Sequence, residues 1–165
     1  MENPLILLVE DNEDDAFLID RAFQRANILN GLRLAKNGEE AIAYLSGTGQ
    51  YANRIDNPLP KLILLDLKMP GIDGFEVLRW IRRQPRWAGL RVVVLTSSTD
   101  VRDVNLAIQL GADGFMIKPA DFLRLVEFSE ALAGCWVWMQ EGPVRPEGAA
   151  AFPGTARALQ SLARD

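Results

Sequence analysis

The chain has 165 residues, of which 48% are hydrophobic and 24% are charged, and its formal net charge is −4. A length of this order suits one domain with a hydrophobic core better than two domains. A net negative charge does not favour binding to nucleic acid. No apolar run approaches the roughly 18 residues of a membrane span. The chain has no histidine and one cysteine, which excludes a Ser-His triad, a His-ligated zinc site and an intrachain disulfide. Such cysteine usage is typical of a reducing cytoplasm.

The first half of the chain alternates apolar runs with helical patterns. Residues 5–9 form a continuous Leu/Ile/Val run, which is typical of a strand buried on both faces of a parallel sheet. Residues 14–26 have the pattern of an amphipathic helix, residues 32–36 form a weaker strand, and a second helix runs from Asn37-Gly38 to near Gly47. The first helix is expected to bury Phe17, Leu18, Ala22 and Phe23 and to expose Asp15, Asp20, Arg21 and Arg25. Residues 48–60 lack periodicity and predict a long loop, which is unusual in a compact domain.

The second half continues this alternation. We expect strands at residues 62–65, 91–95 and 115–117, and helices at residues 75–83, at residues 100–110 and from Pro119 or Asp121 to residue 140. Five strand–helix units in alternation predict an α/β fold, a doubly wound five-stranded parallel sheet with helices on both faces. Residues 141–165 are rich in Ala, Gly and Pro and predict a tail with a short helical segment.

Polar side chains follow four of the predicted strands, at the point where each strand ends. Glu10 and Asp11 follow the first strand, Asp66 the third, Thr96 the fourth and Lys118 the fifth. Because ligands of such sheets bind outside the carboxyl ends of the strands, we expect these side chains to meet in one crevice. Grouped carboxylates need a cation, and Mg²⁺ fits their oxygen atoms best. A carboxylate can also accept a phosphoryl group, whose oxygens a lysine and a hydroxyl can bind.

Three motifs also have simpler interpretations. Asp11 with Asp14 could cap the first helix, although Asp66 favours a cation site. Residues 47–52 match the dinucleotide-binding pattern G-x-G-x-x-A, but they follow a helix and open no clear helix, so we do not interpret them as a nucleotide site. Cys135, among apolar neighbours, is expected to be a packed thiol.

Four motifs give the chain a specific resemblance to the receiver domains of two-component response regulators. They are Val-Glu-Asp-Asn at 9–12, Leu-Leu-Asp-Leu-Lys-Met-Pro-Gly-Ile-Asp-Gly at 64–74, Val-Leu-Thr-Ser at 94–97 and Gly-Ala-Asp-Gly-Phe-Met-Ile-Lys-Pro at 111–119. The resemblance covers residues 4–138 and implies the flavodoxin-like receiver fold with strand order 2-1-3-4-5. It implies a receiver domain at residues 1–140 and a tail at residues 141–165 without an output domain.

The resemblance also implies the chemistry of the crevice. Asp66 would be the phosphoacceptor. Glu10, Asp11, Asp66 and the main-chain carbonyl of Lys68 would hold Mg²⁺ or another divalent cation such as Mn²⁺ or Ca²⁺.

Further residues would couple the phosphoryl group to a change in shape. Thr96 would turn its hydroxyl toward the phosphoryl group, and Phe115 would change its packing with it. Lys118 would pair with the phosphoryl oxygens, and the bond from Lys118 to Pro119 is expected to be cis.

The expected function is a stand-alone cytoplasmic regulator that accepts a phosphoryl group from a sensor histidine kinase and then changes its affinity for a partner or for a second copy. The long loop and the Trp-rich final helix resemble single-domain regulators of phytochrome-type kinases. Such a protein is not an enzyme beyond self-catalysed phosphotransfer and dephosphorylation. One alternative, a haloacid-dehalogenase-like phosphatase, needs a second aspartate at the position of Lys68. The other, a pseudo-receiver binding module, would be favoured by replacement of Asp66 or Lys118, and neither is replaced.

The kinase is the first expected partner. Its dimerisation helix should dock beside Asp66, near Ala120 and against the first helix, where Phe17, Ile19 and Phe23 are either contacts or core. No nucleic acid and no membrane partner are expected.

A second copy of the chain is the other expected partner. One apolar stripe of the last helix is enough to cover the sheet: Phe122, Leu125, Val126, Leu132 and Trp136. A second strip remains, made of Phe128, Cys135, Trp138 and Met139. Exposed apolar strips usually mark interfaces, so we expect a homodimer through the fourth helix, fifth strand and fifth helix. The alternative is that the tail covers this strip with Phe152, Leu159 and Leu162.

Overall fold

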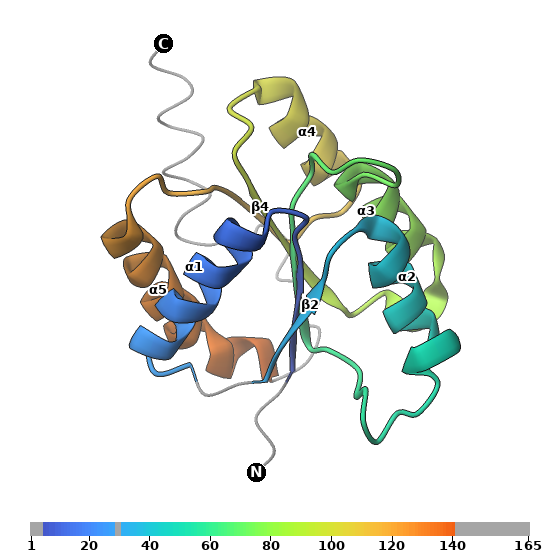
Figure 1. Ribbon diagram of the computed structural model, residues 1–165. Coiled ribbons are helices and arrows are strands. Elements are labelled where there is room, and N and C mark those ends of the chain that lie inside the picture. Colours follow the sequence, from blue (N-terminus) through green and yellow to red (C-terminus); the bar gives the residue numbers. More distant parts are fainter. Residues whose placement is uncertain (1–4, 29–30, 141–165) are drawn as a thin grey trace.

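The computed structural model describes residues 5–28 and 31–140, with side chains described up to residue 133. Five parallel strands form one sheet in the order β2-β1-β3-β4-β5 (Figure 1). The strands are β1 (Ile6–Val9), β2 (Leu32–Ala35), β3 (Leu62–Leu65), β4 (Arg91–Thr96) and β5 (Gly114–Ile117). The predicted fold class and strand order are therefore confirmed.

Among the described residues, five α-helices cover the two faces of this sheet. They are α1 (Glu13–Arg25), α2 (Gly38–Ser46), α3 (Gly74–Arg83), α4 (Val101–Gln109) and α5 (Phe122–Gln140), with short 3₁₀ turns η1 (Gly49–Tyr51) and η2 (Pro85–Trp87). Figure 1 shows α1 and α5 side by side on one face, and α2 and α3 on the other. In the part of the chain that the structure describes, no helix combines the length and apolar character needed to cross a membrane.

The central strands are buried on both faces, as their continuous apolar runs predict. Successive side chains of a strand point to opposite faces. Ile6 and Leu8 of β1 therefore pack with the α1 and α5 side chains, whereas Leu7 and Val9 pack with those of α2 and α3. This double burial fixes where each strand ends, and so where the polar residues that follow it lie.

The buried face of α1 differs from the predicted one. Phe17 and Leu18 are 60% and 42% exposed, so their predicted burial is wrong. The buried residues are Ala16, Ile19, Ala22 and Phe23. These positions follow the i, i+3, i+4 spacing of a helix face, and the two exposed residues lie between its members. Ile19 and Phe23 are thus core residues, and Phe17 and Leu18 are apolar residues that α1 presents to solvent.

The predicted division of α5 into two strips is also wrong at one residue. Phe128 is buried and packs in the same core as Leu125, Val126 and Leu132. Because α5 packs against both the sheet and α1, a wide arc of the helix is covered. The side chains of Cys135, Trp136, Trp138 and Met139, together with the tail at residues 141–165, lie outside what the structure describes.

The loop between α2 and β3 is held by side chains that bond the main chain. Gly47 ends α2 in the left-handed conformation, with φ of 69°. The Arg54 guanidinium donates hydrogen bonds to the carbonyls of Tyr44 and Leu45, at 2.8 and 2.7 Å, and so caps the last turn of α2. The Tyr44 hydroxyl donates to the carbonyl of Pro58 at 2.8 Å. This aperiodic segment is therefore an ordered cap on α2.

Candidate functional site

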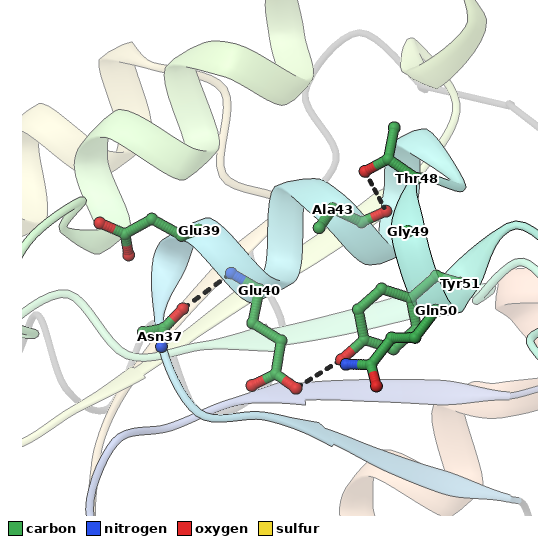
Figure 2. A pocket seen from close by; sticks show the side chains of 8 residues that line it. All are labelled: Asn37, Glu39, Glu40, Ala43, Thr48, Gly49, Gln50 and Tyr51. Atoms are coloured by element: carbon green, nitrogen blue, oxygen red, sulfur yellow. Dashed lines mark hydrogen bonds between the residues drawn. The ribbon is translucent and has the colours of Figure 1, made fainter.

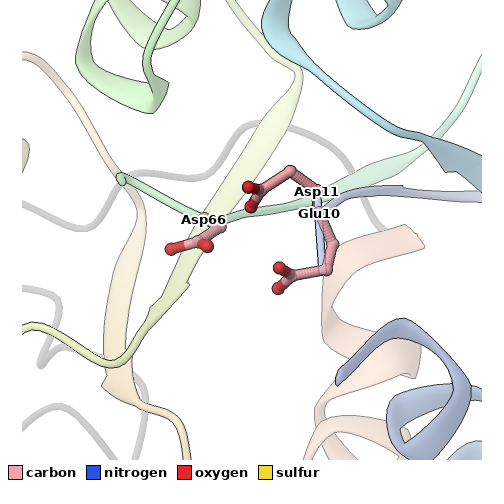
Figure 3. Close-up of side chains that lie close together, drawn as sticks. All are labelled: Glu10, Asp11 and Asp66. Atoms are coloured by element: carbon pink, nitrogen blue, oxygen red, sulfur yellow. The ribbon is translucent and has the colours of Figure 1, made fainter. Parts of the chain in front are cut away.

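Three acidic side chains gather at the carboxyl end of the sheet. Val9 and Leu65 are partners in the pairing of β1 with β3, so Glu10 and Asp66 leave the sheet side by side. One carboxylate oxygen from each of Glu10, Asp11 and Asp66 lies within 4.8 Å of the other two (Figure 3). Glu10 and Asp66 are buried, whereas Asp11 is exposed. Three hard oxygen donors of like charge, open to solvent on one side, suit a divalent cation such as Mg²⁺, Mn²⁺ or Ca²⁺.

The Asp11 and Asp14 capping alternative is not what the structure contains. The N-cap of α1 is Asn12, whose Oδ1 accepts a hydrogen bond from the backbone N–H of Asp15 at 3.0 Å. The backbone N–H of Asn12 in turn donates to Oε1 of Glu10 at 3.0 Å. The start of the helix therefore leaves Asp11 free of a capping role and helps to hold Glu10 in the crevice.

Lys118 reaches this cluster from the end of β5. Its ammonium nitrogen lies 2.5 Å from Oε2 of Glu10 and 3.2 Å from Oδ2 of Asp66. A third carboxylate, Oδ2 of Asp15 in the first turn of α1, lies 3.0 Å away. Asp15, predicted on the exposed face of the first helix, is 40% exposed and also contacts this lysine. A signal was present in the sequence, because α1 begins where β1 ends and its first turn must lie beside the crevice.

The charges of this group depend on one another. Burial lowers the pKa of Lys118, but its hydrogen bonds to Glu10 and Asp15 and the charge of Asp66 outweigh burial and raise that pKa above its ordinary value. Burial raises the pKa of Glu10 above its ordinary value, and the contact with Lys118 opposes that rise without cancelling it. Lys118 therefore stays charged, and its contact with Glu10 favours the ionised form of that carboxylate.

Thr96 and Phe115 lie on the two strands next to this cluster. Thr96 ends β4 and is fully buried, and its Oγ1 accepts a hydrogen bond from the backbone N–H of Ser98 at 3.3 Å. Phe115 is buried in a core shared with Val104 and Ala107 of α4. The carbonyl of Thr96 also accepts from the backbone N–H of Lys118 at 2.7 Å, which joins the ends of β4 and β5.

The peptide bond between Lys118 and Pro119 is not cis, contrary to what the family resemblance led us to expect. It is trans, as are all the other peptide bonds of the described residues. The trans form is the intrinsically favoured one even before proline, by about 0.5–1 kcal/mol.

The segment after Asp66 is held by close packing of α3. A Cβ at Gly74 would lie 2.1 Å from the carbonyl oxygen of Asp66 and 2.7 Å from Cα of Leu67. Asp73 caps α3 in a capping box with Glu76, and the Gly74 N–H donates to the carbonyl of Leu67 at 3.0 Å. The N-terminus of α3 therefore fixes the main chain that carries Asp66.

A second connection leads from this segment to α4. The ammonium of Lys68 lies 3.0 Å from Oδ2 of Asp103, in the first turn of α4. The hydroxyl of Ser98 donates to the same oxygen. Sequence reasoning missed Asp103, which joins the loops that follow β3 and β4.

A shallow pocket of about 410 Å³ lies apart from this cluster, between α2 and η1 (Figure 2). Its central acid, Glu40, already accepts hydrogen bonds from the Tyr51 hydroxyl and from the backbone N–H of Lys36. The dinucleotide pattern at residues 47–52 contributes part of its lining, but it begins at Gly47, where α2 ends, and continues into the three-residue turn η1. The crevice with Asp66 is thus the better candidate.

Comparison with known proteins agrees with this geometry. The sequence model of the response regulator receiver domain matches residues 6–130. The probable methanogenesis regulatory protein FilR2 of Methanothrix harundinacea is 37% identical over 146 residues, which cover 86% of this chain and 90% of that protein. The response regulator Rcp1 of Synechocystis sp. is 34% identical over 133 residues, which cover 81% of this chain and 88% of Rcp1.

Solved structures share the fold. The phosphorylated cyanobacterial phytochrome response regulator RcpA has a TM-score of 0.77 and 33% identity, over 86% of this chain and 99% of RcpA. The response regulator RPA3017, from red light signalling of R. palustris, has a TM-score of 0.79 and 32% identity over the same shares. The Mn²⁺-bound form of Rcp1 has a TM-score of 0.73 and 30% identity, over 91% of this chain and 99% of that chain.

Proposed function

Because the chain belongs to the response regulator receiver family, we propose that Asp66 accepts a phosphoryl group from the phosphohistidine of a sensor histidine kinase. The observation that carries this proposal is the position of the Asp66 carboxylate. It is buried, it lies in a cluster with Glu10 and Asp11, and one of its oxygens is 3.2 Å from the ammonium of Lys118.

The proposed transfer is a displacement at phosphorus. A carboxylate oxygen of Asp66 forms a bond to phosphorus while the bond from phosphorus to the donor imidazole nitrogen breaks, and the imidazole keeps the electron pair. Lys118 supplies a positive charge for the transferring oxygens. Mg²⁺, held by Glu10, Asp11, Asp66 and the main-chain carbonyl of Lys68, would supply charge neutralisation and orient the phosphoryl oxygens. The oxygen donors and the Mn²⁺-bound structure of Rcp1 support a cation of this class.

The switch is proposed to act through Thr96 and Phe115. A phosphoryl group adds close to two negative charges and three strong acceptors to the crevice. The Thr96 hydroxyl turns toward them, and Phe115 repacks in the space vacated. Because Phe115 packs on Val104 and Ala107, this movement changes the surface of α4.

A phytochrome-type kinase is the sensor we propose. The support is that RcpA is described as a phytochrome response regulator and RPA3017 as part of red light signalling. The kinase helix would dock beside Asp66, against the exposed Phe17 of α1 and near Ala120. A cytoplasmic location, and an arrangement of residues 1–140 as a receiver domain followed by a tail at residues 141–165, belong to the same proposal.

A homodimer through α4, β5 and α5 is also proposed. Its support is exposed apolar surface: Val101 and Ile108 on α4 are 46% and 47% exposed, and Leu123 on α5 is 60% exposed. Ile108→Glu should give a monomer in light scattering, whereas Ile55→Glu, in the 91% exposed loop position, should leave the dimer intact. A wild type that stays monomeric at high concentration, with and without phosphorylation, would contradict the dimer.

The two alternative functions gain no support. Lys68 occupies the position where a haloacid-dehalogenase-like phosphatase needs its second aspartate, and both Asp66 and Lys118 are present for a working receiver.

Labelling with acetyl phosphate tests the phosphoacceptor. Acetate then leaves in place of the imidazole. The wild type should take up label in the presence of Mg²⁺ and not with a chelator, and Asp66→Asn should take up none. Asp14→Asn, at an exposed acid outside the cluster, should behave as the wild type does. Label that survives Asp66→Asn would refute the assignment.

A further inference from the structure

The ammonium group of Lys118 has all of its donors in use. A lysine ammonium carries three N–H donors, and here it contacts three carboxylates, those of Glu10, Asp15 and Asp66, at 2.5, 3.0 and 3.2 Å. Oxygens of a transferred phosphoryl group can bond Lys118 only by displacing one of these carboxylates or by sharing a donor with it. The number of carboxylates around Lys118 therefore bears directly on phosphoryl binding.

Asp15 differs from the other two partners of Lys118. The side chains of Glu10 and Asp66 are 1% and 6% exposed and belong to the cation cluster, whereas the Asp15 side chain is 40% exposed and lies on α1. Glu10 and Asp66 already give the lysine two buried anionic partners. Asp15 therefore adds a third negative charge around a single ammonium group.

We propose that Asp15 is a positioning residue for phosphoryl transfer, which holds one N–H of Lys118 away from the phosphoryl group and lowers the affinity of the crevice for that group. The inference rests on the proposed phosphoacceptor function of Asp66. The same negative charge attracts a divalent cation to the neighbouring carboxylates. Asp15 therefore acts in opposite directions on the two ligands, strengthening cation binding and weakening phosphoryl binding.

The test is Asp15→Asn, which keeps the shape of the side chain and removes its charge. The dissociation constant of Mg²⁺ alone is measured first, and then that of beryllofluoride, a phosphoryl mimic, at saturating Mg²⁺. A single charge a few ångströms away in a partly solvated position changes a binding constant by about two- to fivefold. Asp15→Asn should weaken Mg²⁺ binding and tighten beryllofluoride binding, each by about this factor.

Asp14→Asn is the matched control. Asp14 is exposed in the same first turn of α1, loses the same charge on substitution, and is not among the carboxylates that contact Lys118. It should change both constants much less. Affinities that move in the same direction in Asp15→Asn, or no further than in Asp14→Asn, would overturn the role of Asp15. A wild type that fails to bind beryllofluoride in Mg²⁺ would instead overturn the phosphoacceptor function itself.

Discussion

Gly74→Ala should displace Asp66 without altering its side chain. The added Cβ would lie 2.1 Å from the Asp66 carbonyl oxygen and 2.7 Å from Cα of Leu67, where ordinary contacts begin at 3.4 Å. Both neighbours are main-chain atoms, so the chain around Asp66 or the start of α3 must move by more than an ångström. Overpacking of this kind costs about 1–3 kcal/mol, against about 0.4–1 kcal/mol gained from the stiffer unfolded chain. We therefore expect the free energy of unfolding to fall by about 1–2 kcal/mol.

Two assays measure this effect. Urea denaturation followed by tryptophan fluorescence gives the free energy of unfolding, and acetyl phosphate labelling gives the rate of phosphorylation. Displacement of a reacting group by about 1 Å can slow a reaction by about 100-fold, so the labelling rate should fall at least tenfold. Gly89→Ala is the control, because a Cβ there has no heavy atom within 4 Å. It should leave labelling unchanged and the stability equal or slightly higher. If Gly74→Ala matches Gly89→Ala in both assays, the tight packing of α3 on the Asp66 segment is refuted.

Three further predictions concern the crevice and its surroundings. Thr96→Ala should leave labelling by acetyl phosphate nearly intact and abolish the effect of phosphorylation on dimerisation, measured by light scattering; unchanged coupling would contradict the proposed switch. Lys118→Met should lower the free energy of unfolding by about 3 kcal/mol in a chelator, because Glu10 and Asp66 lose the buried ammonium group that pairs with them. Added Mg²⁺ should restore much of this stability. A stability that does not depend on Mg²⁺ would contradict the proposed cation site. Arg21→Glu, on the exposed face of α1, should slow phosphotransfer from the cognate kinase and spare acetyl phosphate, whereas equal slowing with both donors would indicate misfolding.

The strand ends could be predicted from the sequence for a physical reason. A strand buried on both faces is apolar along its whole length, so the first polar residue marks its end. This locates Glu10, Asp66 and Thr96 at one edge of the sheet without knowledge of the tertiary structure.

The ends of the strands place Asp15 near the crevice but do not by themselves predict its contact with Lys118. This contact joins residues 103 positions apart, and it depends on how α1 is placed over the sheet. The burial of Phe128 has the same origin, since the pattern of α5 alone does not reveal that α1 covers a second side of it. For α1 itself, apolar residues at 16–19 and 22–23 allow more than one buried face, and packing selects the one with Ile19.

The order of the loop at residues 48–60 could not be predicted from the sequence for a different reason. Its order comes from the Arg54 guanidinium on the carbonyls of α2 and from the Tyr44 hydroxyl, and neither leaves a periodic signal. The sequence likewise does not reveal that Gly74 packs closely against the carbonyl oxygen of Asp66.

Chemical trapping of the phosphorylated residue tests the central claim most directly. Borohydride reduces an aspartyl phosphate to an alcohol, and mass spectrometry of the digested protein locates the reduced residue. After reaction with acetyl phosphate and Mg²⁺, we predict one reduced residue, Asp66, and none when the cation is chelated. Reduction at Glu10, Asp11 or Asp15, or a phosphorylated protein in which Asp66 is unmodified, would contradict the assignment of Asp66 as the phosphoacceptor.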